Sequence, residues 1–214
     1  MQKGFLMFFL FLISLNIECA ENTQKEMEEN MSETNINKQN VDTATFAGGC
    51  FWCMEPPYDT LDGVISTVVG YIGGSVQNPT YEEVSSGTTG HLEAVQITFD
   101  SSKLSYSDLL QVFWRNIDPT DPYGQFADKG SQYETAIFFH DARQQELALK
   151  SKEELVASGK FTNPIVTKVL PAEQFYPAEE YHQNFYKNHP LRYNNYKVGS
   201  GRAGFLKETW GDEK

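Results

Sequence analysis

Cysteine is scarce in this chain, with only three among 214 residues. Cys19 lies in an N-terminal apolar stretch, so the remainder of the chain holds only Cys50 and Cys53. A disulfide between residues three apart would close almost no loop, and a chain of this length can build its core without disulfides. The two thiols are therefore not expected to serve as a structural staple.

Histidine is also sparse, and its four positions show no pair at metal-ligand spacing. These histidines are His91, His140, His182 and His189. A structural zinc site usually needs four ligands, so Cys50 and Cys53 would require a second Cys or His pair. The sequence predicts no metal site.

Basic residues are in deficit, since 17 Lys and Arg face 29 Asp and Glu and the net charge is −12. Phosphate backbones would be repelled by this charge, which argues against nucleic acid as a partner. We therefore interpret the chain as an enzyme or a binding module that acts on small molecules or proteins. We also expect the protein to be a monomer.

No apolar run is long enough to span a bilayer. The run from Phe5 to Leu15 is too short, and with Lys3 before it the pattern is that of a secretory signal. We predict a signal peptide over residues 1–20, a disordered polar linker over 21–42 and a folded domain over 43–214. This predicts an exported, periplasmic protein. A lipid anchor on Cys19 and an ordinary buried helix are the less favoured alternatives.

The segment Gly49-Cys50-Phe51-Trp52-Cys53 is the most informative part of the sequence. It follows a predicted strand, Thr43–Ala47, and precedes a predicted helix from Met54, which places Cys50 at a strand-to-helix junction. The positive end of a helix dipole favours thiolate, the nucleophilic form of cysteine. Cys53, one turn away, could then close a disulfide. We therefore favour a redox cysteine at position 50 over a small buried hydrophobic residue.

The remaining elements mix strands and helices without regular alternation, which predicts an α+β fold. The predicted strands are Thr43–Ala47, Val64–Tyr71, Leu92–Phe99, Thr135–Phe139 and Ile165–Leu170. The predicted helices are Met54–Leu61, Ser107–Arg115, Ala142–Ser158 and Ala178–Lys187. Residues 116–132 form a long polar loop, and loops of this length are usually functional or disordered.

Glu93 shares one face of its predicted strand with Val95, Ile97 and Phe99. Three of these four side chains are apolar, so the face should point inward and partly dehydrate the carboxyl group. Dehydration raises the pKa of a carboxyl and keeps a proton available near neutral pH. The alternative is a glutamate at a strand end that bends out to water, and strand parity alone does not decide between the two.

Tyr81, Asp128 and Tyr133 carry groups that can hydrogen-bond a polar ligand oxygen. Surface tyrosines and solvated loop aspartates are the ordinary alternatives for these positions. Phe51 and Trp52 could cradle a small apolar group or simply pack in the core. His182, in the aromatic stretch from Phe175 onward, is interpreted as structural.

Together these segments resemble the peptide methionine sulfoxide reductase A family. The resemblance runs over roughly residues 43 to 190 and rests on several motifs in order. They are Gly49-Cys50-Phe51-Trp52, Gly63 to Gly74, Tyr81 to Glu93, Asp128-Lys129-Gly130-Ser131-Gln132-Tyr133 and Phe175 to His182. The family fold that this implies is a two-layer α/β sandwich with a mixed, largely antiparallel sheet and the nucleophile at the N-terminus of the first helix.

The resemblance also implies roles for individual residues. Cys50 would be the nucleophile and Glu93 the proton donor to the sulfoxide oxygen. Tyr81, Asp128 and Tyr133 would hold that oxygen or its water. Phe51 and Trp52 would form the wall of the pocket for the S-methyl group.

The implied activity is reduction of methionine S-sulfoxide, free or in proteins, through a cysteine sulfenic acid. No cofactor is implied beyond an external thiol reductant of the thioredoxin type. Many relatives carry glycine where this chain has Cys53 and place their resolving cysteines near the C-terminus. No cysteine follows Pro190 here, so Cys53 is the only internal candidate for a resolving thiol.

Two other function classes stay open from the residues. A thioredoxin-like disulfide oxidoreductase would share the Cys-x-x-Cys spacing and the exported setting, but would not need Glu93 or the loop from Asp128 to Tyr133. An exported binding module with an aromatic groove would explain the tyrosines and leave the thiols idle.

Overall fold

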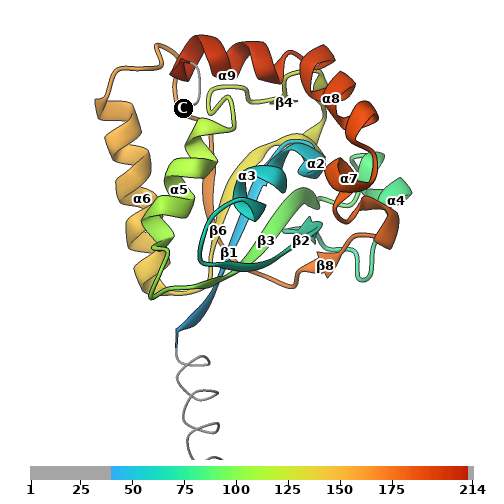
Figure 1. Cartoon of the computed structure of the whole chain (residues 1–214), viewed down its shortest axis with the longest axis horizontal. Helices are drawn as coiled ribbons and strands as arrows, with labels where there is room; N and C mark the ends of the chain where they lie inside the picture. Colours follow the sequence, from blue (N-terminus) through green and yellow to red (C-terminus); the bar gives the residue numbers. More distant parts are fainter. Residues whose placement is uncertain (1–39, 212–214) are drawn as a thin grey trace, which may run out of the picture. The chain divides into compact units, whose positions relative to one another are not determined.

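A six-stranded mixed sheet forms the centre of the structure, a computed structural model that describes residues 40–211 (Figure 1). Apart from Asn40 and Val41, these residues belong to the compact unit Asp42–Lys214. The predicted signal peptide, nearly all of the predicted linker and Cys19 lie outside the described residues. Within residues 40–211, no helix combines the length and apolarity needed to cross a membrane.

The strands lie in the order β7-β6-β1-β3-β2-β8. Their bounds are β1 (Val41–Gly48), β2 (Val64–Ile72), β3 (Leu92–Asp100), β6 (Thr135–Phe139), β7 (Lys168–Pro171) and β8 (Tyr176–Pro177). β6 and β7 pair in parallel, whereas β1 with β6, β2 with β3 and β2 with β8 pair antiparallel. A separate hairpin is formed by β4 (Gly124–Gln125) and β5 (Asp128–Lys129), inside the predicted polar loop.

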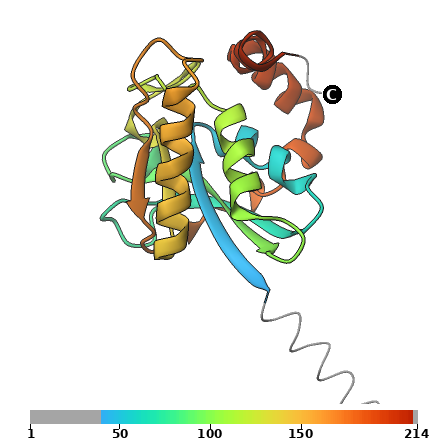
Figure 2. The same ribbon diagram turned by 90° about the vertical axis from the view of Figure 1, so that its left-hand side faces the viewer.

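Helices form the second layer, with α5 and α6 side by side over one face of the sheet (Figure 2). The longer helices are α5 (Tyr106–Arg115), α6 (Ala142–Ala157), α8 (Pro190–Gly199) and α9 (Arg202–Trp210). The short helices are α2 (Phe51–Met54), α3 (Pro56–Asp59), α4 (Tyr81–Ser85) and α7 (Phe185–Asn188), with 3₁₀ turns η1 (Ser131–Tyr133) and η2 (Glu180–His182). The predicted two-layer α+β architecture is confirmed.

The hydrophobic core lies between the sheet and the helices. Phe46 of β1 stacks on Tyr58 and Phe113 at ring-centroid distances of 5.6 and 5.2 Å, and all three side chains are fully buried. Leu109, one turn before Phe113 on α5, is also fully buried. The helix therefore buries an apolar stripe against β1, which fixes the strand that leads to Cys50.

Several predicted element bounds are wrong. The helix predicted from Met54 is two short helices, because Pro56 has no amide hydrogen to continue α2 and instead begins α3. The helix predicted over Ala178–Lys187 is replaced by η2 and α7, which are separated by Asn184 in the left-handed conformation at φ 52°. β7 begins at Lys168, later than Ile165. α4, α8 and α9 were not predicted.

A substitution at Gly70 tests how closely β8 packs against β2. A Cβ atom at Gly70 would lie 2.3 Å from the carbonyl oxygen of Tyr176, so Gly70→Ala should destabilise the protein by about 1–3 kcal/mol. Gly204 is the control, since it lies inside α9 with nothing within 4 Å of its added Cβ. Gly204→Ala should raise stability by up to about 1 kcal/mol. Urea denaturation measures both, and equal effects would contradict the close approach of β8.

Candidate active site

Cys50 is the N-cap residue of α2 and follows directly on the turn that ends β1. Gly49 makes this turn at φ +80°, a conformation that favours glycine. The side chain of Cys50 makes no capping hydrogen bond to the helix and is 7% exposed. The thiol therefore lies at the start of a helix without being used to cap it, as the sequence predicted.

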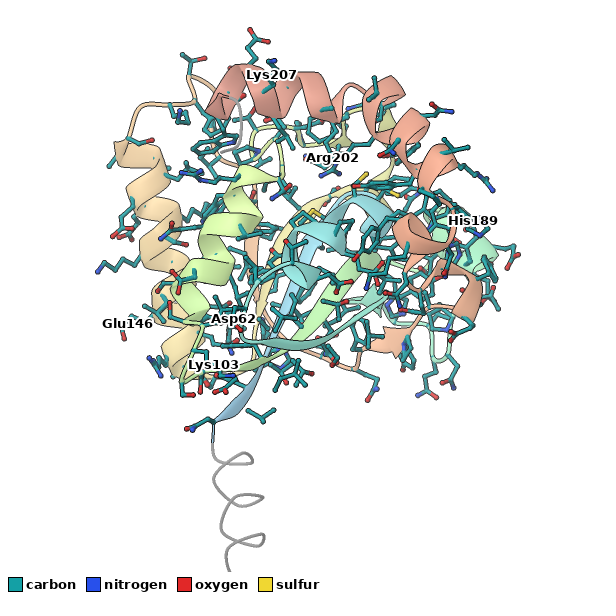
Figure 3. All side chains as sticks on the ribbon, in the orientation of Figure 1. Asp62, Lys103, Glu146, His189, Arg202 and Lys207 are labelled. Carbon is teal, nitrogen blue, oxygen red and sulfur yellow. The ribbon has the colours of Figure 1, made fainter. Side chains whose placement is uncertain are left out.

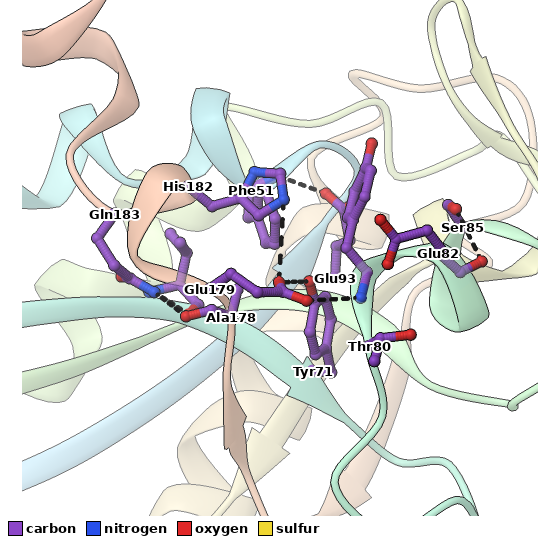
Figure 4. Close-up of polar contacts among 12 residues, drawn as sticks. Phe51, Tyr71, Thr80, Glu82, Ser85, Glu93, Ala178, Glu179, His182 and Gln183 are labelled. Carbon is purple, nitrogen blue, oxygen red and sulfur yellow. Dashed lines mark hydrogen bonds and ion pairs between the residues drawn. The ribbon is translucent and has the colours of Figure 1, made fainter.

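At the start of α2, Glu93 supplies the hydrogen-bond acceptor that the side chain of Cys50 does not provide. Its Oε2 accepts a hydrogen bond of 3.0 Å from the amide of Phe51, the residue after Cys50 (Figure 4). Glu93 is the second residue of β3 and is 2% exposed, and Val95, Ile97 and Phe99 on the same face are fully buried. Of the two positions considered for the Glu93 side chain, the structure has the inward one.

The environment of Glu93 favours its protonated form. Burial raises the pKa of its carboxyl to about 8, the hydrogen bond from Phe51 lowers the pKa, and the negative charge of Asp128 raises it. The carboxyl group therefore keeps a proton at neutral pH directly beside the residue that carries the thiol.

Cys50 and Cys53 are both free thiols, both buried and hydrogen-bonded to each other. Burial raises the pKa of Cys50 well above its ordinary value, and the bond with Cys53 and the charge of Glu93 raise it further. The prediction that the helix dipole leaves Cys50 ionised at rest is therefore wrong. α2 has only four residues, and the loss of hydration outweighs the field of so short a helix.

Cys53 is the thiol of the pair on which negative charge is stabilised. The hydrogen bond from Cys50 lowers the pKa of Cys53, burial raises it, and the guanidinium of Arg202 lowers it. Of the two thiols, Cys53 is therefore the one that gives up its proton more readily.

The three predicted oxygen-binding residues lie around this pair although they come from separate elements. Tyr81 begins α4, Asp128 begins β5 and Tyr133 ends η1. Burial raises the pKa of Tyr81 to about 12 and also raises that of Tyr133, and the charges of Glu93 and Asp128 raise both further. Both phenols therefore remain protonated hydrogen-bond donors that face the carboxyl of Glu93.

Local hydrogen bonds set these three positions. α4 starts at Tyr81 because Thr80 and Glu83 form a reciprocal capping box. The side-chain amide of Gln132 donates through Nε2 to the carbonyl of Ser85 at 2.9 Å, which joins η1 to the end of α4. The Thr-x-x-Glu spacing of the capping box is a signal in the sequence that could have predicted α4.

Phe51 and Trp52 differ in their surroundings. Phe51 is 1% exposed within the main core cluster, whereas Trp52 is half-buried and stacks on Phe185 at 3.7 Å between ring centroids. The indole Nε1 of Trp52 donates to Nδ1 of His182 at 3.1 Å. His182 is buried and has the structural position predicted for it, because it holds the indole ring in place.

Glu179, which the sequence analysis missed, connects this aromatic group to two other elements (Figure 4). Its carboxylate accepts hydrogen bonds from the hydroxyl of Tyr71 at 2.9 Å and from the amide of Tyr81 at 2.8 Å, and lies 4.0 Å from His182. One carboxylate thus ties β2, α4 and η2 together beside the thiols.

Tyr196 is a second residue that the sequence analysis missed. It lies on α8, and its hydroxyl donates to Oδ2 of Asp128 and is hydrogen-bonded to the thiol of Cys50. Its ring meets Trp52 edge-on at 5.9 Å between centroids. Nothing in the local pattern around Tyr196 indicates this contact, because it depends on how α8 packs against β5.

Glu55 is a further buried acid, at the junction of α2 and α3. It is 0% exposed, and its Oε1 accepts from the amide of Asn184 at 3.1 Å. Burial raises the pKa of Glu55 to about 7. Across residues 40–211, no group of three or more His, Cys, Asp and Glu side chains could hold a metal ion.

Comparison with known proteins assigns the family. The sequence profile described as peptide methionine sulfoxide reductase matches residues 42–214. The peptide methionine sulfoxide reductase MsrA of Bacillus subtilis is 60% identical over 168 residues, which is 78% of this chain and 95% of the relative. The corresponding protein of Bacillus licheniformis is 57% identical over 168 residues, covering 78% of this chain and 93% of the relative.

Solved structures agree with the sequence comparison. Reduced Mxr1 of Saccharomyces cerevisiae is similar with a TM-score of 0.67 and 32% identity, over 72% of this chain and 88% of that one. The same yeast protein in complex with Trx2 gives a TM-score of 0.50 and 26% identity, over 69% and 86%. With the profile, the relatives and the fold in agreement, the chain belongs to the peptide methionine sulfoxide reductase A family and is a peptide-methionine (S)-S-oxide reductase.

Proposed function

We propose that this enzyme reduces methionine S-sulfoxide, free or in proteins, by attack of the Cys50 sulfur on the sulfoxide sulfur with Glu93 as the acid. The observation that carries this is the hydrogen bond from the amide next to Cys50 to the buried carboxyl of Glu93, whose pKa is raised to about 8. A proton delivered to the sulfoxide oxygen prevents an uncompensated negative charge from forming in a dry pocket.

The proton of Cys50 has to leave before its sulfur becomes a strong nucleophile. The hydrogen bond to Cys53 provides a direct acceptor, because negative charge is favoured on Cys53 at rest. In this scheme the proton passes to Cys53 as Cys50 attacks. Glu93 gives its own proton to the oxygen, methionine departs, and Cys50 becomes a sulfenic acid.

Tyr81, Tyr133 and Asp128 are proposed to hold the sulfoxide oxygen. The raised pKa values of the two phenols keep them as donors toward it. Phe51 and Trp52 are proposed to form the wall against the S-methyl group. The hydroxyl of Tyr196 contacts both Asp128 and Cys50, and we propose that it helps to orient Asp128 toward the sulfoxide oxygen.

Regeneration is proposed to use Cys53 and an external reductant. Cys53 attacks the sulfenic acid, a disulfide to Cys50 forms and water leaves. A thioredoxin-like protein then reduces that disulfide by thiol exchange. The complex of yeast Mxr1 with Trx2 supports a reductant of this kind, and no resident cofactor enters the scheme.

The thioredoxin-like disulfide oxidoreductase is not favoured as the alternative. The family profile covers the stretch from residue 42 to residue 214, and relatives in the methionine sulfoxide reductase family match 78% of the chain. A reduction assay on insulin beside an assay on methionine sulfoxide separates the two activities.

Glu93→Gln tests the acid role. The substitution keeps the shape of the side chain and removes its transferable proton, so turnover should fall by about 10²–10⁴-fold with the fold retained. Glu154→Gln is the control, because Glu154 is exposed on α6. Thiol-dependent reduction of the separated sulfoxide epimers measures both variants, and full activity of Glu93→Gln would remove the acid role.

The same variant should change how stability depends on pH. The pKa of Glu93 is about 8 in the folded protein and about 4.3 when unfolded, so the folded state holds an extra proton between these values. That contribution is complete below pH 4 and is lost as the pH rises through 8, by about 1.4 kcal/mol per pH unit.

The free energy of unfolding should therefore decline less steeply with pH in Glu93→Gln than in the wild type. Glu55 contributes a slope of the same sign to both proteins, and the difference between them isolates Glu93. Urea denaturation across this pH range gives the two curves. Parallel curves would show that the carboxyl of Glu93 is not dehydrated in the folded protein.

Mass spectrometry after one turnover tests the resolving thiol. In a Cys19→Ser background, the enzyme given one equivalent of sulfoxide should lose two hydrogen atoms and show a Cys50–Cys53 disulfide. Cys53→Ser should instead gain one oxygen atom on Cys50. A persistent sulfenic acid with unmodified Cys53 in the parent protein would discard Cys53 as the resolving thiol.

A further inference from the structure

Arg202 is a buried cation that has no carboxylate partner among residues 40–211. It is the first residue of α9 and is 1% exposed. None of the ion pairs in the part of the chain that the structure describes includes Arg202. Burying an unpaired charge is costly, so the position of this guanidinium group calls for a physical cause.

The guanidinium contacts the segment that carries both thiols from two sides. Its Nη2 donates to the carbonyl of Gly48 at 2.8 Å, two residues before Cys50. Its Nη1 donates to Sδ of Met54, the residue after Cys53, at 3.6 Å. Nη1 also donates to the carbonyl of Asn116, and these neutral groups satisfy the hydrogen atoms of the guanidinium without neutralising its charge.

Gly49 provides the room for this approach. A Cβ atom at Gly49 would lie 2.9 Å from Nη2 of Arg202 and 2.6 Å from Cβ of Gln125. Any side chain at position 49 would therefore displace the guanidinium from the thiol segment. Arg202 points from α9 toward the interior, whereas Lys207 lies on the exposed face of the same helix (Figure 3).

We propose that Arg202 is the counter-charge of the thiol pair, and that it holds negative charge on Cys53 so that Cys53 can attack the sulfenic acid of Cys50. This inference rests on the proposed function, in which Cys53 is the resolving thiol. Arg202 acts through Cys53 and touches no substrate atom, so it is a positioning residue.

The groups that face Cys53 come from five elements. They are Cys50 at the start of α2, Glu93 on β3, Asp128 on β5, Tyr193 and Lys197 on α8, and Arg202 on α9. The hydrogen bond from Cys50 lowers the pKa of Cys53 most. Of the two cations that also lower it, Arg202 has a larger effect than Lys197. Asp128 opposes this effect, and Glu93 is protonated at neutral pH.

The step that Arg202 assists is the formation of the disulfide. Cys53 first releases the proton that it took from Cys50 during the attack on the sulfoxide. The Cys53 thiolate then donates an electron pair to the Cys50 sulfur, a sulfur–sulfur bond forms, and the sulfur–oxygen bond of the sulfenic acid breaks. The oxygen leaves as hydroxide and takes up one proton to become water. Because the thiolate is the attacking species, a group that increases its fraction at neutral pH accelerates this step.

The first measurement is the ionisation of Cys53 alone. In the full chain carrying Cys19→Ser and Cys50→Ser, ultraviolet absorbance of the thiolate against pH reports Cys53. Arg202→Gln should raise the midpoint by about one pH unit or more, because an opposite charge is removed. Arg202→Lys keeps the charge and should preserve most of the shift, and Lys207→Gln should leave the midpoint unchanged.

The second measurement is the first turnover of the Cys19→Ser enzyme, quenched at successive times. Arg202→Gln should slow disulfide formation at pH 7 about tenfold relative to the parent, and higher pH should restore the rate. Arg202→Lys loses the planar guanidinium group that donates to two carbonyl groups but keeps the positive charge. Its rate of disulfide formation should therefore stay close to that of the parent. A merely structural role predicts instead that Lys fails as Gln does.

Equal midpoints of the Cys53 titration in the parent and Arg202→Gln, or disulfide formation at pH 7 as fast in Arg202→Gln as in the parent, would overturn the role of Arg202. Should Arg202→Gln fail to fold, a slow disulfide step in folded Arg202→Lys with no recovery at higher pH would overturn it as well. Disulfide formation in the parent enzyme distinguishes a failure of the role of Arg202 from a failure of the proposed function. If Cys53 does not resolve the sulfenic acid, the parent itself forms no Cys50–Cys53 disulfide.

Discussion

The site depends on one hydrogen bond, from the amide of Phe51 to the carboxyl of Glu93. It joins the start of α2 to β3 and satisfies a helix amide that the side chain of Cys50 leaves unpaired. The same bond keeps the acid beside the residue that reacts. Because both groups are buried, neither carboxyl nor thiol can be displaced without breaking the packing between the first helix and the sheet.

Burial has opposite consequences for stability and for chemistry in this site. It raises the pKa values of Glu93, Glu55 and Cys50, so the folded protein carries groups whose charged forms are unfavourable. Each of these groups lowers stability when it ionises. The same shift favours a proton on Glu93 at neutral pH, which is what the proposed acid role requires.

The C-terminal helices take part in the site without contributing a cysteine. α8 brings Tyr196 to Asp128 and Cys50, and α9 brings Arg202 beneath the thiol segment. Cys50 is 7% exposed and Cys53 is 2% exposed.

The sequence alone determined the elements with strong local signals and singled out the residues proposed to carry the chemistry. Periodicity located β2, β3, β6, α5 and α6 to within a residue or two, the strand-to-helix junction singled out Cys50, and strand parity left an inward and an outward position open for Glu93, of which the structure has the inward one. Tertiary structure decided the ionisation of the thiols and the parts played by Glu179, Tyr196 and Arg202. Those properties depend on burial and on contacts between segments far apart in the chain, such as Tyr196 with Asp128 and Arg202 with Gly48, and no local pattern encodes them.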